Sequence, residues 1–173
     1  MSIDQIPLPP DVAGRLFAAG LLDVGPDAAA ALAALNADLL VCLLPDEDID
    51  LHHARFPRFG EWLRQEGVPS GQALRFEIDD GSVPDIEDMV ALIDQLAVRL
   101  RAGQSVVAHC AAGWGRTSLV CGLLLIAFGT PSIAEALTAV RAARPGAGPE
   151  NPDQREHLAA VFVRLAQRPI NRP

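Results

Sequence analysis

The chain has 173 residues, of which 50% are hydrophobic, and it carries a formal net charge of -8 at pH 7. This length and apolar content fit one domain with a substantial core, over residues 1–173. The acidic balance argues against nucleic acid as a partner, because few cations are present to displace the counterions of a phosphate backbone.

The sequence also bears on the compartment. The first residues lack a basic segment followed by an apolar core, and the longest apolar run, residues 119–128, is too short to cross a bilayer. We therefore expect a soluble, cytoplasmic protein without a membrane partner. Three cysteines in a chain of this length do not form a disulfide framework, which fits a reducing compartment. Nothing in the pattern indicates an oligomeric state.

The first half of the chain is predicted to contain four strands and two helices. The strands are residues 3–8, 14–17, 39–44 and 73–78. One helix starts with Pro26 near its first turn and runs to Asn36. The other covers residues 55–66 and should end at Gly67.

The second half is predicted to continue this alternation. An amphipathic helix over residues 84–101 leads into a strand at 105–108, and a short loop then opens a buried helix to residue 128. Further helices are expected up to residue 143 and over 152–165, the last one capped by Asn151. The alternation predicts an α/β fold with a central sheet and helices on both faces.

The loop before the buried helix contains the candidate catalytic and phosphate-binding residues. It reads His109-Cys110-Ala111-Ala112-Gly113-Trp114-Gly115-Arg116-Thr117. The two glycines allow a tight turn with inward N–H groups, and the N-terminus of the following helix adds positive potential. Arg116 can donate to two phosphate oxygens at once. The same environment favours a Cys110 thiolate, which would be a nucleophile beside a bound phosphate.

This loop resembles the signature His-Cys-x-x-Gly-x-x-Arg-Ser/Thr of the cysteine-based tyrosine and dual-specificity phosphatases, and the likeness covers roughly residues 39–165. It implies a dual-specificity phosphatase-like, mostly parallel sheet and a reaction without a metal or cofactor. Cys110 would form a phosphocysteine, Thr117 would help the sulfur leave, and His109 would orient the loop. The phosphate would be bound by Arg116 together with Ala111, Ala112, Gly113, Trp114 and Gly115.

A phosphatase of this type also needs an acid for the leaving oxygen. Asp80-Gly81-Ser82-Val83-Pro84 resembles the acid loop of the kinase-associated and Cdc-type enzymes, and Asp80 stands 30 positions before Cys110. Asp79 and Asp85 are the alternatives, since carboxylates here could also cap a helix. Gln154 matches the residue that positions the hydrolytic water in relatives, or else it sits in the first turn of the last helix.

The expected substrate is a phosphorylated protein side chain or a small phosphomonoester. The chain contains no Tyr, so a tyrosine-bearing recognition loop is absent and a shallower, dual-specificity pocket is expected. The loop also lacks the lysines of enzymes that act on inositol lipids. A phosphoinositide or inositol phosphatase, a phosphate-binding pseudophosphatase, and a thiol enzyme such as an arsenate reductase or sulfurtransferase remain as alternatives.

Other side chains are weaker candidates for a functional role. Arg55 and Arg58 could lie at the pocket rim or on a solvated helix face. His52 and His53 lack further ligands at metal-site spacing. Cys42 could capture an oxidised Cys110 as a disulfide or serve as a small buried side chain. Trp114 could flank the pocket mouth or pack beneath the loop.

Overall fold

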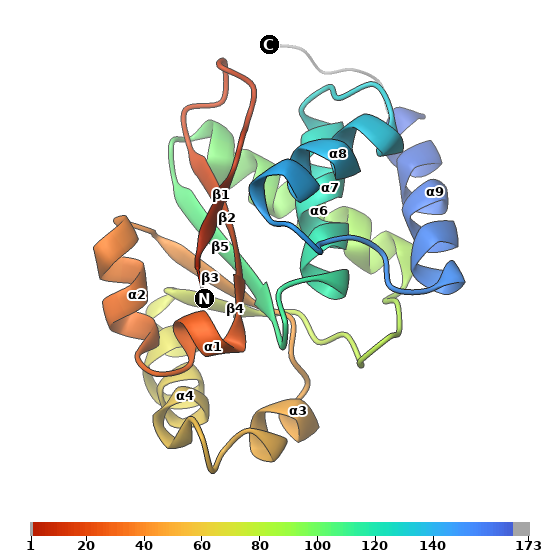
Figure 1. The fold of residues 1–173 in the computed structure, drawn as a ribbon. Coiled ribbons are helices and arrows are strands. Elements are labelled where there is room, and N and C mark those ends of the chain that lie inside the picture. Colours follow the sequence, from red (N-terminus) through yellow and green to blue (C-terminus); the bar gives the residue numbers. More distant parts are fainter. Residues whose placement is uncertain (1, 168–173) are drawn as a thin grey trace.

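The computed structural model describes residues 2–167 as an α/β layered structure (Figure 1). Five strands form one sheet in the order β1-β2-β5-β3-β4. Their bounds are β1 Asp4–Ile6, β2 Arg15–Gly20, β3 Leu39–Cys42, β4 Ala73–Arg75 and β5 Ser105–Cys110. All neighbouring strands are parallel except β1, which pairs antiparallel with β2. The predicted mostly parallel sheet is confirmed.

Helices cover both faces of the sheet, with α6 to α9 on one side and α2 and α4 on the other (Figure 1). Their bounds are α1 Leu21–Val24, α2 Ala28–Leu35, α3 Asp46–Leu51, α4 Pro57–Trp62, α5 Val68–Ser70, α6 Ile86–Arg101, α7 Gly115–Ala127, α8 Ile133–Ala143 and α9 Pro152–Ala166. A π-helical turn, η1 Leu63–Gly67, joins α4 to α5. No described helix is long and apolar enough to span a membrane.

The core forms because the central strands are apolar on both sides. Every residue of β3 and β5 is buried, as expected for parallel strands that lie between helical layers. Helix α7 is buried along almost its whole length, from Gly115 to Leu125, whereas α6 buries one stripe and leaves Val98 at the surface. Strand β5 and the helix α7 after it therefore lie at the centre of the molecule.

Three local predictions are corrected. Pro26 precedes the N-cap Asp27 of α2 instead of lying in the first turn. Gly67 does not end the helical segment that contains Phe59, because the backbone continues through α5 and stops at Gly71, whose φ is 78°. The short helices α1 and α3 were not predicted, since four and six residues are too few to show a helical period.

Candidate active site

The site lies where the parallel strands β2, β5 and β3 end, the edge of an α/β sheet at which ligands usually bind. The Cys110 loop, residues 110–116, follows β5 and leads into α7. Cys110 is buried, with 3% of its surface exposed. Its sulfur accepts hydrogen bonds from the Gly113 amide at 3.2 Å and the Thr117 hydroxyl at 3.1 Å.

The loop points its amides inward because its carbonyls are held from behind. The Ala111 oxygen accepts from Leu21 N at 2.9 Å, at the start of α1. Arg144 donates to the oxygens of Ala112 at 3.0 Å and Gly113 at 2.9 Å. With these carbonyls fixed outward, the N–H groups are free to face an anion.

Glycines make this close packing possible. Gly113 has φ 75°, and a Cβ there would collide with the Ala19 carbonyl. A Cβ on Gly20 would lie 2.9 Å from the Ala112 oxygen. The two backbones approach so closely that only glycine fits at either position.

Arg144 is a buried anchor that the sequence analysis missed. Besides its two bonds to the loop, it donates to Asp4 Oδ2 at 2.6 Å and to the Ser2 carbonyl at 2.8 Å. Asp23 Oδ2 lies 3.5 Å from its Nη2. One guanidinium thus ties the Cys110 loop to the N-terminal strand and to α1.

Arg116 is 2% exposed and faces two carboxylates. Its Nη1 donates to Asp48 Oδ2 at 2.7 Å and to the Ile78 carbonyl at 2.9 Å, and its Nη2 donates to Asp80 Oδ1 at 2.9 Å. Burial opposes the charge of Arg116, but the hydrogen bond to Asp48 and the nearby Cys110, Asp48 and Asp80 outweigh it, so the pKa of Arg116 is raised.

Asp48 is a second contact that the sequence analysis missed. It lies on α3, the short helix that follows β3 and was not predicted from the sequence. Its place near Arg116 follows from the sheet, because β3 and β5 are parallel neighbours and their carboxyl ends meet at one edge. The strand order needed for that step was not predictable from the sequence.

The three candidate acids of the Asp80 loop, residues 79–85, differ in their contacts. Asp80 reaches Arg116 and has a side chain that is 77% exposed. Asp85 is the N-cap of α6, where it accepts from Glu87 N at 2.8 Å. Asp79 is exposed, and its carboxylate has no hydrogen bond or ion pair within the described residues. Of the three, only Asp80 lies against the Cys110 loop.

Gln154 is fully buried, and both ends of its amide are used within the protein. Its Oε1 accepts from Glu150 N at 2.9 Å, and its Nε2 donates to the Ser82 carbonyl at 3.4 Å. Asn151 Nδ2 donates to the Gly81 carbonyl at 2.6 Å. These contacts tether the Asp80 loop to the start of α9, and Gln154 lies in the first turn of that helix.

Trp114 and Glu150 lie at the outer side of the loop. The Trp114 side chain is 46% exposed and lies over Gly146, so it is not packed beneath the loop. The carboxylate of Glu150 is in contact with Gly115, where it would collide with any Cβ. This acidic side chain was not among the predicted site residues.

His109 directly precedes Cys110 in β5. Its ring is fully buried, its Nδ1 is 3.3 Å from the Cys110 carbonyl, and it meets Phe59 edge to face with ring centroids 5.3 Å apart. Burial lowers the pKa of His109 to about 4, so the ring is neutral at pH 7. No group of three or more His, Cys, Asp or Glu among the described residues could hold a metal ion.

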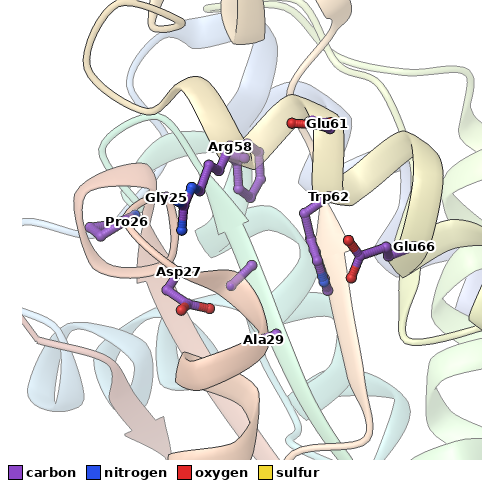
Figure 2. Close-up of a pocket in the computed structure, with 10 residues that line it drawn as sticks. Gly25, Pro26, Asp27, Ala29, Arg58, Glu61, Trp62 and Glu66 are labelled. Carbon is purple, nitrogen blue, oxygen red and sulfur yellow. The ribbon is translucent and has the colours of Figure 1, made fainter.

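The remaining candidates lie elsewhere. Arg58 lines a different cavity (Figure 2), and Arg55 stacks on Phe56 at 5.4 Å. Cys42 is the register partner of His109 in β3, so its side chain points to the same face as His109 and away from that of Cys110. Burial raises the pKa of the Cys42 thiol to about 12.

Comparisons with known proteins agree with this arrangement. Residues 61–130 match a family model described as "Polymorphic toxin system, DSP-PTPase phosphatase". That segment contains β5, the Cys110 loop and α7. A search of the curated proteins found no match.

Similar solved structures span nearly the whole chain. Tk-PTP in its active form has a TM-score of 0.68 at 24% identity, covering 95% of this chain and 99% of its own. A kinase-associated phosphatase whose catalytic cysteine is replaced by serine has a TM-score of 0.79 at 20% identity, with 98% of both chains covered. PTPMT1 in complex with PI(5)P has a TM-score of 0.66 at 19% identity, covering 87% and 92%. The shared fold and the family-model match confirm the resemblance to the cysteine-based phosphatase superfamily.

Proposed function

We propose that this chain is a cysteine-dependent phosphatase that hydrolyses phosphomonoesters through a phosphocysteine intermediate. The observation that carries the proposal is the convergence on Cys110 of the Gly113 amide and the Thr117 hydroxyl, with Arg116 beside the same loop. The hydrogen bonds hold the sulfur in place, and the loop amides with the guanidinium favour a phosphate dianion next to it.

In the first step the Cys110 thiolate attacks phosphorus, an S–P bond forms, and the P–O bond to the alcohol breaks. Asp80 gives its proton to the departing oxygen. Bound phosphate would take the Arg116 donor that now bonds Asp80, which would release the Asp80 carboxyl toward the departing oxygen.

In the second step a water attacks phosphorus, the S–P bond breaks, and inorganic phosphate leaves. Asp80, now ionised, takes the proton of the water, and the Thr117 hydroxyl stabilises the departing sulfur through its 3.1 Å hydrogen bond. We assign Gln154 to holding the Asp80 loop, because both ends of its amide are already bonded.

The substrate we favour is a phosphorylated protein side chain: phosphotyrosine, phosphoserine or phosphothreonine. The Cys110 loop contains no lysine, and the exposed carboxylates of Asp80 and Glu150 lie close to it, which disfavours ligands that carry several phosphates. The fold shared with PTPMT1, which was solved with PI(5)P, keeps a lipid or inositol phosphate as the second candidate.

The test is turnover of para-nitrophenyl phosphate by the full chain and by Cys110→Ser. We expect the serine variant to lose at least about 10³-fold in kcat, because a serine hydroxyl is not ionised at this position. Cys121→Ala, which removes a buried thiol from α7, is the matched control and should retain activity. Turnover that survives Cys110→Ser excludes the mechanism.

Substrate class is tested separately, by comparing kcat/KM for phosphopeptides with kcat/KM for phosphoinositides and inositol phosphates. Higher values for phosphopeptides support the first candidate, and higher values for the inositol compounds support the second. A wild-type chain that binds vanadate but turns over none of these compounds is a pseudophosphatase.

A further inference from the structure

The turn that presents Asp80 has no regular structure of its own. It lies in the segment between β4 and α6, residues 76–85. Within it, Ser82 N donates to the Asp79 carbonyl at 3.0 Å, and Gly81 has φ 70°. One such hydrogen bond closes a turn but does not place it relative to the rest of the protein. Contacts from other elements must therefore decide where Asp80 lies.

Asn151 holds this turn with one end of its amide and caps α9 with the other. Its Oδ1 accepts from Gln154 N at 2.9 Å, as the N-cap of the helix. Its Nδ2 donates to the Gly81 carbonyl at 2.6 Å, and that carbonyl belongs to the residue directly after Asp80. Because the cap needs the acceptor end of the amide, the donor end is fixed toward Gly81.

The helix behind Asn151 is well packed. α9 buries a stripe of side chains that includes Leu158 and Val161, and it contacts α6 and α7. Helix α7 carries Arg116 in its first turn. Figure 1 shows the start of α9 beside the segment that enters α6. The turn of Asp80 is therefore held from the same helical layer that carries the arginine of the Cys110 loop.

Gln154 supports the same turn less directly. Its Nε2 donates to the Ser82 carbonyl at 3.4 Å, a longer bond than that of Asn151 and one residue further from Asp80. Its Oε1 is bonded to Glu150 N at the start of α9. The shorter bond, beside the acid itself, makes Asn151 the stronger candidate for fixing the position of Asp80.

We propose that Asn151 is the positioning residue of the general acid. By holding the Gly81 carbonyl it keeps the Asp80 carboxyl within reach of the oxygen that leaves phosphorus, and it acts on the reaction only through Asp80. This inference rests on the proposed function, in which Asp80 donates that proton. Displacement of a catalytic group by about 1 Å can cost on the order of 10²-fold in rate, so the loss of one such hydrogen bond is measurable.

The experiment is steady-state kinetics on the full chain and on Asn151→Ser. Serine is also a preferred N-cap, so α9 keeps its cap, but the hydroxyl is too short to reach the Gly81 carbonyl. We expect kcat/KM for phenyl phosphate to fall about tenfold, because its leaving oxygen needs the proton. For 6,8-difluoro-4-methylumbelliferyl phosphate, whose leaving group departs as an anion, kcat/KM should stay within about twofold of the wild type. The quantity kcat/KM is used because it includes P–O cleavage and excludes hydrolysis of the phosphocysteine.

Two further variants and a second readout complete the design. Asn36→Ser makes the same exchange at the C-cap of α2, where the side chain has no hydrogen bond within the described residues, and should change neither ester. Asn151→Asp keeps the cap and the shape but removes the donor, so it should lower the ratio of the two kcat/KM values even if Asn151→Ser does not fold. Hydrogen exchange of the Ser82 amide, whose bond to Asp79 closes the turn, should be several-fold faster in both Asn151 variants.

The outcomes separate this inference from the proposed function. With an active wild type, an unchanged ratio between the two esters overturns the role of Asn151, whether both values fall or neither does. A wild type that turns over neither ester contradicts the proposed function instead. Exchange of the Ser82 amide then decides alone: faster exchange in the variants supports Asn151 as the residue that holds the turn, and unchanged exchange overturns it.

Discussion

The carboxylate of Asp80 lies 2.9 Å from Nη2 of Arg116, so the proposed acid is paired with the arginine proposed to bind phosphate. The Asp80 side chain is 77% exposed while that of Arg116 is 2% exposed, which leaves Asp80 as the partner that can swing away. An incoming phosphate therefore competes with a carboxylate for the same guanidinium.

Removing this competitor should strengthen the binding of inert oxyanions. Asp80→Asn is expected to bind vanadate or phosphate several-fold more tightly than the wild type, because the amide neither neutralises Arg116 nor repels the anion. The same variant should lose about 10²-fold or more in kcat toward alkyl phosphates, whose leaving oxygen needs the proton.

The readouts are inhibition constants for vanadate and kcat for each ester. Asp79→Asn is the matched control, since it removes the adjacent carboxylate, which has no contact to Arg116. If Asp79→Asn loses as much turnover as Asp80→Asn, the acid has been assigned to the wrong residue.

Asp48 should set the orientation of Arg116. Its 2.7 Å hydrogen bond leaves Nη2 and Nε of the guanidinium for other partners, so Asp48→Asn is expected to lower kcat/KM about tenfold by loosening that orientation. Asp50→Asn changes an exposed carboxylate on the same helix and should have no effect. Steady-state kinetics on both variants make the comparison, and equal losses would show a general charge effect instead.

Arg144 should matter for both stability and the shape of the Cys110 loop. Arg144→Ala leaves the partly buried carboxylates of Asp4 and Asp23 without their cation, which is expected to cost about 3 kcal/mol of unfolding free energy. Arg144→Lys keeps the charge but cannot reach two carbonyls in the same way, so it should retain more stability than Arg144→Ala and still bind vanadate more weakly than the wild type.

Urea unfolding and vanadate inhibition separate the two effects. Arg155→Ala, on the exposed face of α9, is the control for loss of an arginine. Wild-type vanadate affinity in Arg144→Lys would mean that the two carbonyl bonds do not shape the loop.

The sequence was sufficient for the parts of the site that follow from local pattern. A glycine-containing loop between an apolar strand and a buried helix predicted the position of Cys110 and Arg116, and the cap Asn151 with Pro152 predicted the start of α9. These features depend on neighbours within a few residues, which a single chain displays directly.

The contacts that complete the site depend on strand order, so they could not be predicted from local sequence pattern. Asp48 is 68 positions from Arg116, and Arg144 is 140 positions from Asp4. Their pairing requires β3 to lie beside β5 and β1 to lie at the edge of the sheet. Gln154 shows a similar limit, since its position in the chain was conspicuous but its hydrogen bonds to Glu150 and Ser82 could not be predicted from the sequence.

His109 should make stability depend on pH. Its pKa is about 4 in the folded protein because of burial, against about 6.5 when unfolded, so the unfolded chain binds more protons between these values. This contribution to stability is complete above about pH 6.5 and is lost as the pH falls toward 4, by up to about 1.4 kcal/mol per pH unit.

The test compares urea unfolding at pH 7 and pH 5 for the wild type and His109→Gln. We expect a smaller loss of stability in the variant, because the glutamine does not titrate. His157→Gln is the comparison, since burial also lowers the pKa of His157 but that ring is not enclosed by the sheet. An identical pH dependence in the wild type and His109→Gln would mean that the ring is accessible to protons in the folded state.

Oxidation should not link Cys42 to Cys110. A disulfide needs the two Cβ atoms to face each other at about 4 Å, whereas the β3–β5 register pairs Cys42 with His109 and directs Cys42 and Cys110 to opposite faces of the sheet. Burial also raises the pKa of the Cys42 thiol to about 12, so almost no thiolate is present to attack an oxidised sulfur. Peptide mapping by mass spectrometry after peroxide treatment should therefore find Cys110 oxidised to its acids and Cys42 as a free thiol. A peptide that joins the two cysteines would require β3 and β5 to separate or shift, and would contradict the register on which the site is built.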